Sequence, residues 1–496
     1  DTGIYVPGVH YNETDPIMTG NYFQRGEYWE RLLHIEYFDT NGNIGFAQNT
    51  GVRIHGGATR HAAQKSLRLY ARREYGTQHF NYQLLPQKDV SQYKRFILRS
   101  SMSGGTMIRD DIAQDISKNL NIENQNSQPV IVFINGEYWG VHTIKDRIDE
   151  RYIEYTYNID KDSVEFKGFS NPDYENLMNF IEFNDLSYNT NYDYVKEQID
   201  INNFIDYYIA QIYYANTDWP GNNIKFWRPH ISNGKWKWIL YDTDFGFGLV
   251  EWVGHNTLEF ALEANGPGWP NPPWSTFLFR SLMENEEFQI KFIDHFCYYL
   301  NTRFEASNVV EHISNVSNHI APEMSNHAYR WGGSYLQWSQ NAFGISSWGE
   351  QRDDYIFSHL EDYFNLNETS NLDVSSIPSE GGSISTSGQP IPEDGWTAKY
   401  FTGIPIELTA NPNPGYVFSH WIGVSNSTDP TVSISLDGDA NIAAVFLEND
   451  SPTTILINEL LAANESINTD ETGEYEDWVE LYYDISGLMN LNGYFL

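Results

Sequence analysis

The sequence is short of cysteine, of positive charge and of long apolar runs. Its single cysteine, Cys297, excludes a disulfide within the chain. The 30 Lys and Arg residues face 67 Asp and Glu residues, and this net charge of −37 argues against general binding of nucleic acid or of anionic lipid. No apolar run reaches the roughly 18 residues of a membrane-spanning helix. Any site that handles phosphate must therefore gather its few basic residues locally.

What the sequence does contain predicts a folded α+β chain of several domains. A length of 496 residues indicates about two to four domains, and 16% aromatic residues supply large side chains for their cores. Strands and helices mix up to about residue 370, and short alternating strands in 372–448 indicate a small all-β module. Residues 453–496 contain strands too few to close a domain. We expect the chain to be a piece of a longer protein.

Four polar residues occur in an order that suits phosphoryl transfer. Lys65 lies on a predicted strand after a glycine-containing turn, and Asp218 and Asn223 follow the predicted helix 201–216. Asp242 ends the next predicted strand. Carboxylate and amide oxygens hold Mg²⁺ in such sites, and a cation contacts the nucleotide phosphates. The gap of five from Asp218 to Asn223 equals that between the base Asp and the metal-binding Asn of the kinase catalytic loop.

The strand that ends at Asp242 leaves two alternatives open. Asp244 has the same strand parity as Asp242, so it is a rival or a second metal ligand, and it begins a literal Asp-Phe-Gly triplet. Trp236 and Trp238 share that face of the strand. An indole there could stack on a purine, or it could simply fill the core.

Three sequence blocks occur in a recognisable order around these residues. They read RIHGGATRHAAQKSLRLYAR, INGEYWGVHTIKDRIDERYI and KWKWILYDTDFGFG. Together with the Asp218–Asn223 loop, they resemble the CotH kinase family, which is named for a spore-coat protein. The resemblance covers residues 1–370 and implies an atypical protein-kinase-like fold there.

The resemblance implies a role for each matching residue. Asp218 would be the catalytic carboxylate, and Asn223 and Asp242 would bind Mg²⁺ or Mn²⁺. Trp236 would stack on the adenine of ATP, and Lys65 would contact phosphate. Residues implied as helpers on the nucleotide side are Arg60, Arg68 and Asp146.

Three departures from the family pattern fall on the nucleotide side. Asp146 replaces a Glu, so an ion pair with Lys65 would be looser or bridged by water. His55 replaces an Arg, and Gly57 replaces an Asn. The departures are expected to weaken nucleotide binding more than metal binding.

The remaining residues resemble two other modules. Residues 372–448 are similar to the divergent internalin-type B repeat, whose signature is met by Gly415-Tyr416-Val417-Phe418 and Trp421. Residues 453–496 are similar to the start of a lamin-tail domain, which is an immunoglobulin-like sandwich. The resemblance implies spacers or adhesive units outside a bacterial cell.

Three classes of function follow. The first is a secreted or cell-surface kinase that uses ATP and Mg²⁺ or Mn²⁺ to phosphorylate Ser or Thr of extracellular or surface proteins. Its partners would be nucleotide, protein acceptor and surface proteins that bind the C-terminal modules. The second is a surface adhesion or binding protein whose kinase fold has weak or no catalysis, which the departures and the tail modules favour. The many tryptophans raise carbohydrate binding as a third idea. Asp218, Asn223 and Asp242 together favour the enzyme, because adhesion does not require them.

Overall fold

The computed structural model describes residues 2–100, 105–166, 171–231, 233–449, 455–461 and 477–483. The chain divides into two compact units, Asp1–Glu368 and Thr369–Leu496. Within the described ranges, no helix combines the length and the apolar character needed to cross a membrane.

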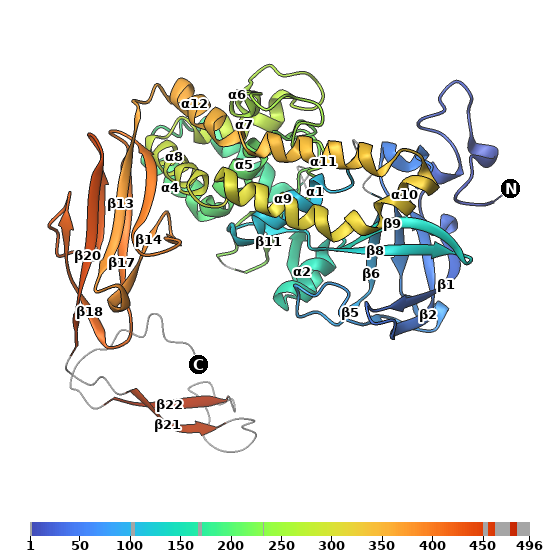
Figure 1. Ribbon diagram of the computed structural model, residues 1–496, viewed down its shortest axis with the longest axis horizontal. Coiled ribbons are helices and arrows are strands. Elements are labelled where there is room, and N and C mark those ends of the chain that lie inside the picture. Colours follow the sequence, from blue (N-terminus) through green and yellow to red (C-terminus); the bar gives the residue numbers. More distant parts are fainter. Residues whose placement is uncertain are drawn as a thin grey trace. The chain divides into compact units, whose positions relative to one another are not determined.

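A six-stranded antiparallel sheet begins the first unit, in the order β1-β2-β3-β6-β9-β8 (Figure 1). The bounds are β1 (Arg31–Phe38), β2 (Ile44–Ile54), β3 (Leu67–Tyr70), β6 (Arg95–Arg99), β8 (Ser127–Ile134) and β9 (Glu137–Lys145). The edge strand β1 alternates half-buried and exposed residues, which is the pattern of a strand covered on one face. The predicted hairpin at Asn135-Gly136 is confirmed, and both residues have the positive φ that its tight turn requires.

The core of this sheet is aromatic and aliphatic. Leu69, Phe80, Phe96 and Ile144 are each at most 2% exposed. Burial of one such side chain stabilises the fold by roughly 1.5–3 kcal/mol. Phe80 belongs to a short strand pair, β4 (Phe80–Asn81) with β5 (Gln92–Tyr93). The sheet is therefore a rigid platform for the side chains at its strand ends.

Helix α5 (Ile201–Tyr213) is the central helix of the rest of the unit, and it is the helix that the sequence predicts. Asp200 caps it by accepting a hydrogen bond from the backbone of Asn203, and every residue of the helix except Asn202 is buried. The other helices are α1 (Arg109–Ile116), α2 (Glu150–Tyr157), α3 (Pro172–Phe183), α4 (Asn189–Gln198), α6 (Thr257–Leu262), α7 (Pro273–Leu282), α8 (Glu286–Leu300), α9 (Ala306–Ile320), α10 (Met324–Trp331), α11 (Tyr335–Gly349) and α12 (Arg352–Phe364).

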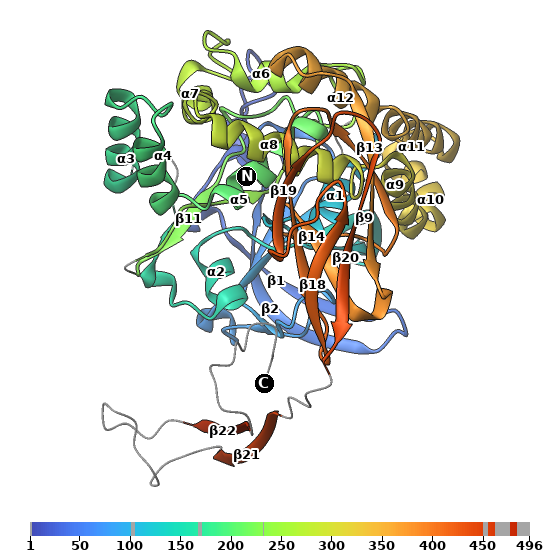
Figure 2. The same ribbon diagram turned by 90° about the vertical axis from the view of Figure 1, so that its left-hand side faces the viewer.

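A smaller sheet lies beside α5, in the order β10-β11-β12-β7. Its strands are β10 (Val164–Phe166), β11 (Phe226–Pro229), β12 (Lys237–Leu240) and β7 (Glu123–Asn124). Trp238 on β12 packs edge-on against Phe204 of α5, with ring centroids 4.7 Å apart. Figure 2 shows α3 and α4 paired on one side of the unit, where Phe180 contacts Tyr194. The contact of Trp238 with Phe204 packs β12 against α5, and the loops after these two elements carry the candidate active site.

The second unit is all β, as the sequence predicts. Two four-stranded sheets have the orders β16-β13-β20-β18 and β15-β14-β17-β19. The bounds are β13 (Thr369–Ile377), β14 (Gly382–Thr386), β15 (Gln389–Pro390), β16 (Trp396–Phe401), β17 (Pro405–Pro412), β18 (Tyr416–Gly423), β19 (Thr431–Ser435) and β20 (Ala440–Glu448). Trp421 is fully buried and its indole donates to the carbonyl of Asp429. A further pair, β21 (Ile455–Leu461) with β22 (Trp478–Tyr483), is antiparallel. The rest of the lamin-tail prediction lies outside the described residues.

Candidate active site

The loop after α5 presents Asp218. Its carboxylate accepts hydrogen bonds from the side-chain amides of Asn222 (2.8 Å) and Asn223 (2.9 Å). The side-chain oxygen of Asn216 accepts from the backbone of Asp218, and the buried indole of Trp219 donates to Tyr207 of α5. The loop is thus held from both sides of Asp218, and the Asp218–Asn223 pair that the sequence predicts is in direct contact.

The environment of Asp218 favours its protonated form more than water does. Burial raises the pKa of Asp218, and the charge of Asp244 raises it further. Hydrogen bonds from Asn222, Asn223 and the exposed Trp269 act in the opposite direction without cancelling the rise. A carboxylate with a raised pKa is a better proton acceptor than an ordinary Asp.

The loop after β12 carries the other two acids, Asp242 and Asp244. One guanidinium nitrogen of Arg99, Nη2, pairs with Oδ1 of Asp242 and also lies 3.1 Å from Oδ2 of Asp244. The two carboxylates therefore converge on one point. The structure brings both candidate ligands together at Arg99. Burial raises the pKa of Asp242, and Asp244 adds to the rise while Arg99 opposes it.

Gly246 joins the two loops. The carbonyl oxygen of Tyr214 would lie 2.6 Å from a Cβ at position 246, so only glycine allows this approach. The same carbonyl accepts a 2.8 Å hydrogen bond from the backbone of Phe247. The loop of Asp242 is thereby fixed against the start of the loop of Asp218.

Helix α1 holds the loop that carries Asp242 and Asp244, because Thr243 of that loop donates to Asp110 of the helix. Lys145, which is fully buried at the end of β9, pairs with Asp110 and lies 2.7 Å from Asp111. Burial alone would raise the pKa of Asp110, but Lys145 and Arg99 hold it well below its usual range. Asp110 is therefore a permanent anion beside Asp242.

Three basic side chains from three separate segments lie within electrostatic reach of one another. We call Arg68, Arg147 and Lys225 the basic group. Burial lowers the pKa of Lys225 to about 8, and the charges of Arg147, Asp242 and Arg68 also act on it. Burial and Arg68 likewise lower the pKa of Arg147. In a chain with a net charge of −37, such a gathering of cations next to Asp242 is a local feature suited to phosphate.

The basic group is held in place by neighbours. Arg68 contacts the ring of His55 at 2.6 Å, and Arg147 pairs with Asp149 at 2.9 Å. Lys225 donates to a backbone carbonyl and lies over the ring of Tyr241. Burial and the neighbouring arginines lower the pKa of His55 well below its usual value, so this ring is neutral at physiological pH.

Comparison with known families identifies the family of the chain. The model of the CotH kinase protein family matches residues 52–356, which is more than half of the chain. The chain belongs to the CotH kinase family. A second family model, the divergent InlB B-repeat domain, matches residues 372–450. No curated protein gives a significant match to the chain.

Lys65 departs from the role that the CotH resemblance implies. Its ammonium donates to the carbonyls of Arg60 and Ala62, both at 2.8 Å, and lies over the ring of Tyr22. The side chain thus bends back onto its own turn before β3. Arg60 is also a structural residue, because it donates to the carbonyls of Gly56, Tyr22 and Gln24.

Asp146 does not pair with Lys65 in this structure. Asp146 pairs instead with Lys88 at 2.8 Å. The sequence places Lys65 on a strand, but β3 begins only at Leu67. Lys65 therefore lies in the preceding turn, where nearby carbonyls satisfy its ammonium.

Trp236 fills the core in this structure. The indole is fully buried, contacts Tyr174 and Phe226 edge-on, and is covered by the guanidinium of Arg228. The implied stacking on adenine would need an open indole face, which this packing does not leave. The alternative of a core tryptophan describes Trp236 in this conformation.

The donor set at the two loops fits a divalent metal ion in chemistry. Asp242, Asp244 and the amide of Asn223 supply the oxygen ligands that Mg²⁺ and Mn²⁺ prefer. Across the described residues, no three His, Cys, Asp or Glu side chains are arranged to hold a metal ion. The fit therefore depends on the amide oxygen of Asn223 and on the two carboxylates that now bind Arg99.

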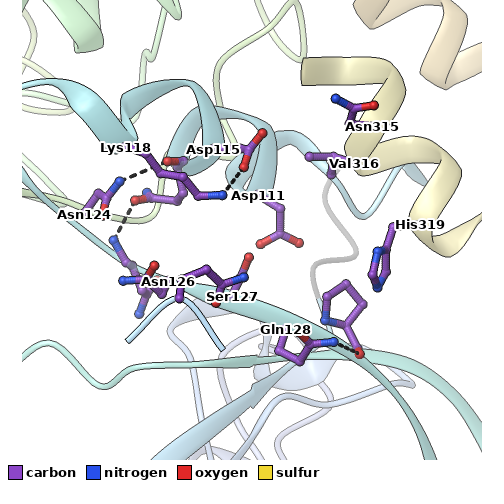
Figure 3. Close-up of a pocket in the computed structure, with 14 residues that line it drawn as sticks. Asp111, Asp115, Lys118, Asn124, Asn126, Ser127, Gln128, Asn315, Val316 and His319 are labelled. Atoms are coloured by element: carbon purple, nitrogen blue, oxygen red, sulfur yellow. Dashed lines mark hydrogen bonds and ion pairs between the residues drawn. The ribbon is translucent and has the colours of Figure 1, made fainter. Parts of the chain in front are cut away.

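A cavity of about 210 Å³ borders α1, the start of β8 and α9 (Figure 3). Asp111 and Asp115 line it from α1, and His319 lines it from α9. Asp111 also pairs with Lys145, and Lys145 pairs in turn with Asp110. One lysine therefore connects the cavity wall to the carboxylate of Asp110. It is separate from the two loops that carry the candidate active site.

Proposed function

We propose that the chain is an ATP-dependent kinase that phosphorylates Ser or Thr of extracellular or surface proteins. The observation that carries the proposal is the contact of Asp218 with Asn223 in a loop tied to the loop of Asp242. Membership of the CotH kinase family supports it. The basic group beside these acids supports a nucleotide as the phosphate donor.

Asp218 is the acceptor-side residue of this proposal. The acceptor hydroxyl oxygen forms a bond to the γ-phosphorus of ATP while the bond from that phosphorus to the β–γ bridging oxygen breaks. ADP leaves with the bonding electron pair, and the hydroxyl proton passes to the carboxylate of Asp218. The raised pKa of Asp218 suits this role, because the carboxylate must hold the proton when the bond forms.

The remaining residues bind and orient. Arg68, Arg147 and Lys225 would contact the phosphates and hold ATP in line with the acceptor. Asn223, Asp242 and Asp244 would hold a divalent cation, which neutralises phosphate charge when it is bound. The acidic surface of the chain favours acceptor segments that are basic or neutral. We also propose a location at the bacterial cell surface or beyond it, which the following B-repeat domain supports.

A second candidate is a surface binding protein with a weakly active kinase fold. Two observations favour it: Arg99 occupies Asp242 and Asp244, and Trp236 is packed in the core. Neither observation removes a residue that the kinase chemistry needs.

Phosphate transfer from γ-labelled ATP tests the proposal. The chain is incubated with Mg²⁺ or Mn²⁺ and a mixed library of Ser and Thr peptides. We expect label on peptides with the native chain and loss of label with Asp218→Ala and with Asp242→Ala. Binding of ATP without any transfer by the native chain would favour the second candidate, and absence of both would contradict the proposal.

A further inference from the structure

Arg99 occupies the point where the candidate metal ligands converge. It is the last residue of β6, which pairs with β3 on one side and with β9 on the other. One atom of Arg99, Nη2, contacts both Asp242 and Asp244. The side chains of Arg99, Asp242 and Asp244 are 17%, 31% and 12% exposed, respectively. One half-buried guanidinium thus lies against both acids, and the charges of Arg109 and Asp244 also act on each other.

The acids cannot easily move away from this point. The backbone N–H and the hydroxyl of Thr243, which lies between them, both donate to Asp110. Gly246 and Phe247 are fixed on the carbonyl of Tyr214. The side chain of Arg99 is long and has more rotatable bonds than the two aspartates, so it is the part of this contact that can move. Any cation that takes the two carboxylates must therefore displace the guanidinium.

A guanidinium and a divalent cation compete for these oxygens. The guanidinium keeps its charge at any accessible pH, so the two cations repel each other at one site. A displaced guanidinium needs another anion, and a phosphate accepts its planar fork of donors well. Arg99 already acts on the pKa of His55 together with Arg68 and Arg147, so it lies within electrostatic reach of the proposed phosphate side.

We propose that Arg99 is a displaceable latch that couples nucleotide binding to metal binding. Without nucleotide, it holds Asp242 and Asp244 and keeps the affinity for a divalent cation low. When nucleotide binds, its phosphates offer Arg99 a second partner and free the carboxylates for the cation. The inference rests on the proposed function, because it needs a nucleotide at the basic group. It makes Arg99 a positioning residue.

The test measures Mn²⁺ binding to the full chain by the electron paramagnetic resonance signal of free Mn²⁺, with and without a non-hydrolysable ATP analogue. In the native chain we expect weak binding of Mn²⁺ alone and a large gain with the analogue, corrected for Mn²⁺ bound by free analogue. Couplings between sites are commonly about 5- to 150-fold. In Arg99→Gln we expect Mn²⁺ alone to bind at least about fivefold tighter and the gain from the analogue to shrink by a similar factor.

Lys225→Gln is the matched control at pH 7. It removes one positive charge that acts on Asp242, yet Lys225 contacts a carbonyl and a ring and makes no ion pair with that acid. We expect Lys225→Gln to change the affinity for Mn²⁺ alone by less than about twofold and to lower the affinity for the ATP analogue.

Each outcome decides. The latch is overturned, and the kinase proposal left standing, if Mn²⁺ alone binds the native chain and Arg99→Gln equally well. The same conclusion follows if Lys225→Gln tightens the binding of Mn²⁺ alone as much as Arg99→Gln does. Analogue that binds neither chain, with or without Mn²⁺, would instead contradict the proposed function. If Arg99→Gln melts well below the native chain, Arg99→Lys takes its place. It keeps the charge without the planar fork, and we expect its Mn²⁺ affinity to exceed the native value.

Discussion

Asp110 accepts two hydrogen bonds from Thr243 on the same oxygen, one from the backbone N–H at 2.9 Å and one from the hydroxyl at 2.8 Å. Its other oxygen pairs with Lys145 of β9. Helix α1 therefore connects the large sheet to the loop that carries Asp242 and Asp244. Stability and site geometry depend on the same carboxylate.

Asp110→Asn should be strongly destabilising. The change leaves Lys145 buried with half of its compensating charge, since Asp111 remains 2.7 Å away. Breaking a buried pair typically costs 3–5 kcal/mol, so we expect the free energy of unfolding to fall by about 3 kcal/mol. Urea denaturation followed by tryptophan fluorescence measures it. Asp115→Asn, on the same helix but in partly exposed ion pairs, should cost less than about 1 kcal/mol. Equal losses in the two variants would argue against the described role of Asp110.

The affinity for ATP should fall as pH rises through about 8. Burial lowers the pKa of Lys225 to about 8, so its ammonium loses its charge, and its attraction for phosphate, above that pH. Calorimetric titration with ATP between pH 6.5 and 9.5 measures the effect. Lys225→Arg should keep the affinity flat to about pH 9, because a guanidinium does not titrate there. Lys65→Met serves as the control, since the pKa of Lys65 is also lowered to about 8. A decline that persists in Lys225→Arg would exclude Lys225 as its cause.

Substitutions at Lys65 and Arg68 should affect different quantities. The change at Lys65 should lower the stability of the fold, and the change at Arg68 should lower the affinity for ATP. Lys65→Met leaves the carbonyls of Arg60 and Ala62 without their donor, which should cost about 1–3 kcal/mol in unfolding free energy. Its affinity for ATP should stay within about twofold of the native value. Arg68→Gln should lower the affinity for ATP by about tenfold, equivalent to about 1.4 kcal/mol, with a smaller effect on the free energy of unfolding. The reverse pattern would restore Lys65 to the phosphate site.

Trp236 should act as a core residue. Trp236→Ala should lower the unfolding free energy by about 3–5 kcal/mol, as for other buried aromatic truncations. Trp252→Ala, at a position that is 63% exposed, should change it by less than about 0.5 kcal/mol. Thermal melting of both variants with and without ATP provides the measurement. A Trp236→Ala chain that melts like the native one but no longer responds to ATP would instead indicate adenine stacking.

The sequence was sufficient for those parts of the site that depend on local spacing. Asp218 and Asn223 lie in one loop after a strongly apolar helix, so their separation along the chain fixes their contact. Asp242 and Asp244 follow one strand, and the structure brings both to Arg99. The family membership and the all-β character of the second unit were predicted and are confirmed.

Side chains from distant segments could not be placed in the same way. Arg99 ends β6, Arg147 follows β9, and Lys225 precedes β11, so no spacing connects them. A signal existed for Lys225, which stands two residues after Asn223. Lys65 was misplaced because β3 begins only at Leu67, so residue 65 belongs to the preceding turn, whose carbonyls take its ammonium. Trp236 illustrates the same limit, since its burial depends on residues from α3 and β11.

The most direct test of the account is the fate of the γ-phosphate. Native chain, ATP and Mg²⁺ are incubated with the acceptor peptides that label best, and mass spectrometry counts phosphoserine and phosphothreonine against ADP formed. We expect one phosphorylated residue for each ADP, and a rate that falls by about 10²- to 10⁴-fold in Asp218→Asn while ATP binding persists. ADP formation without phosphopeptide, or an unchanged rate in Asp218→Asn, would contradict it.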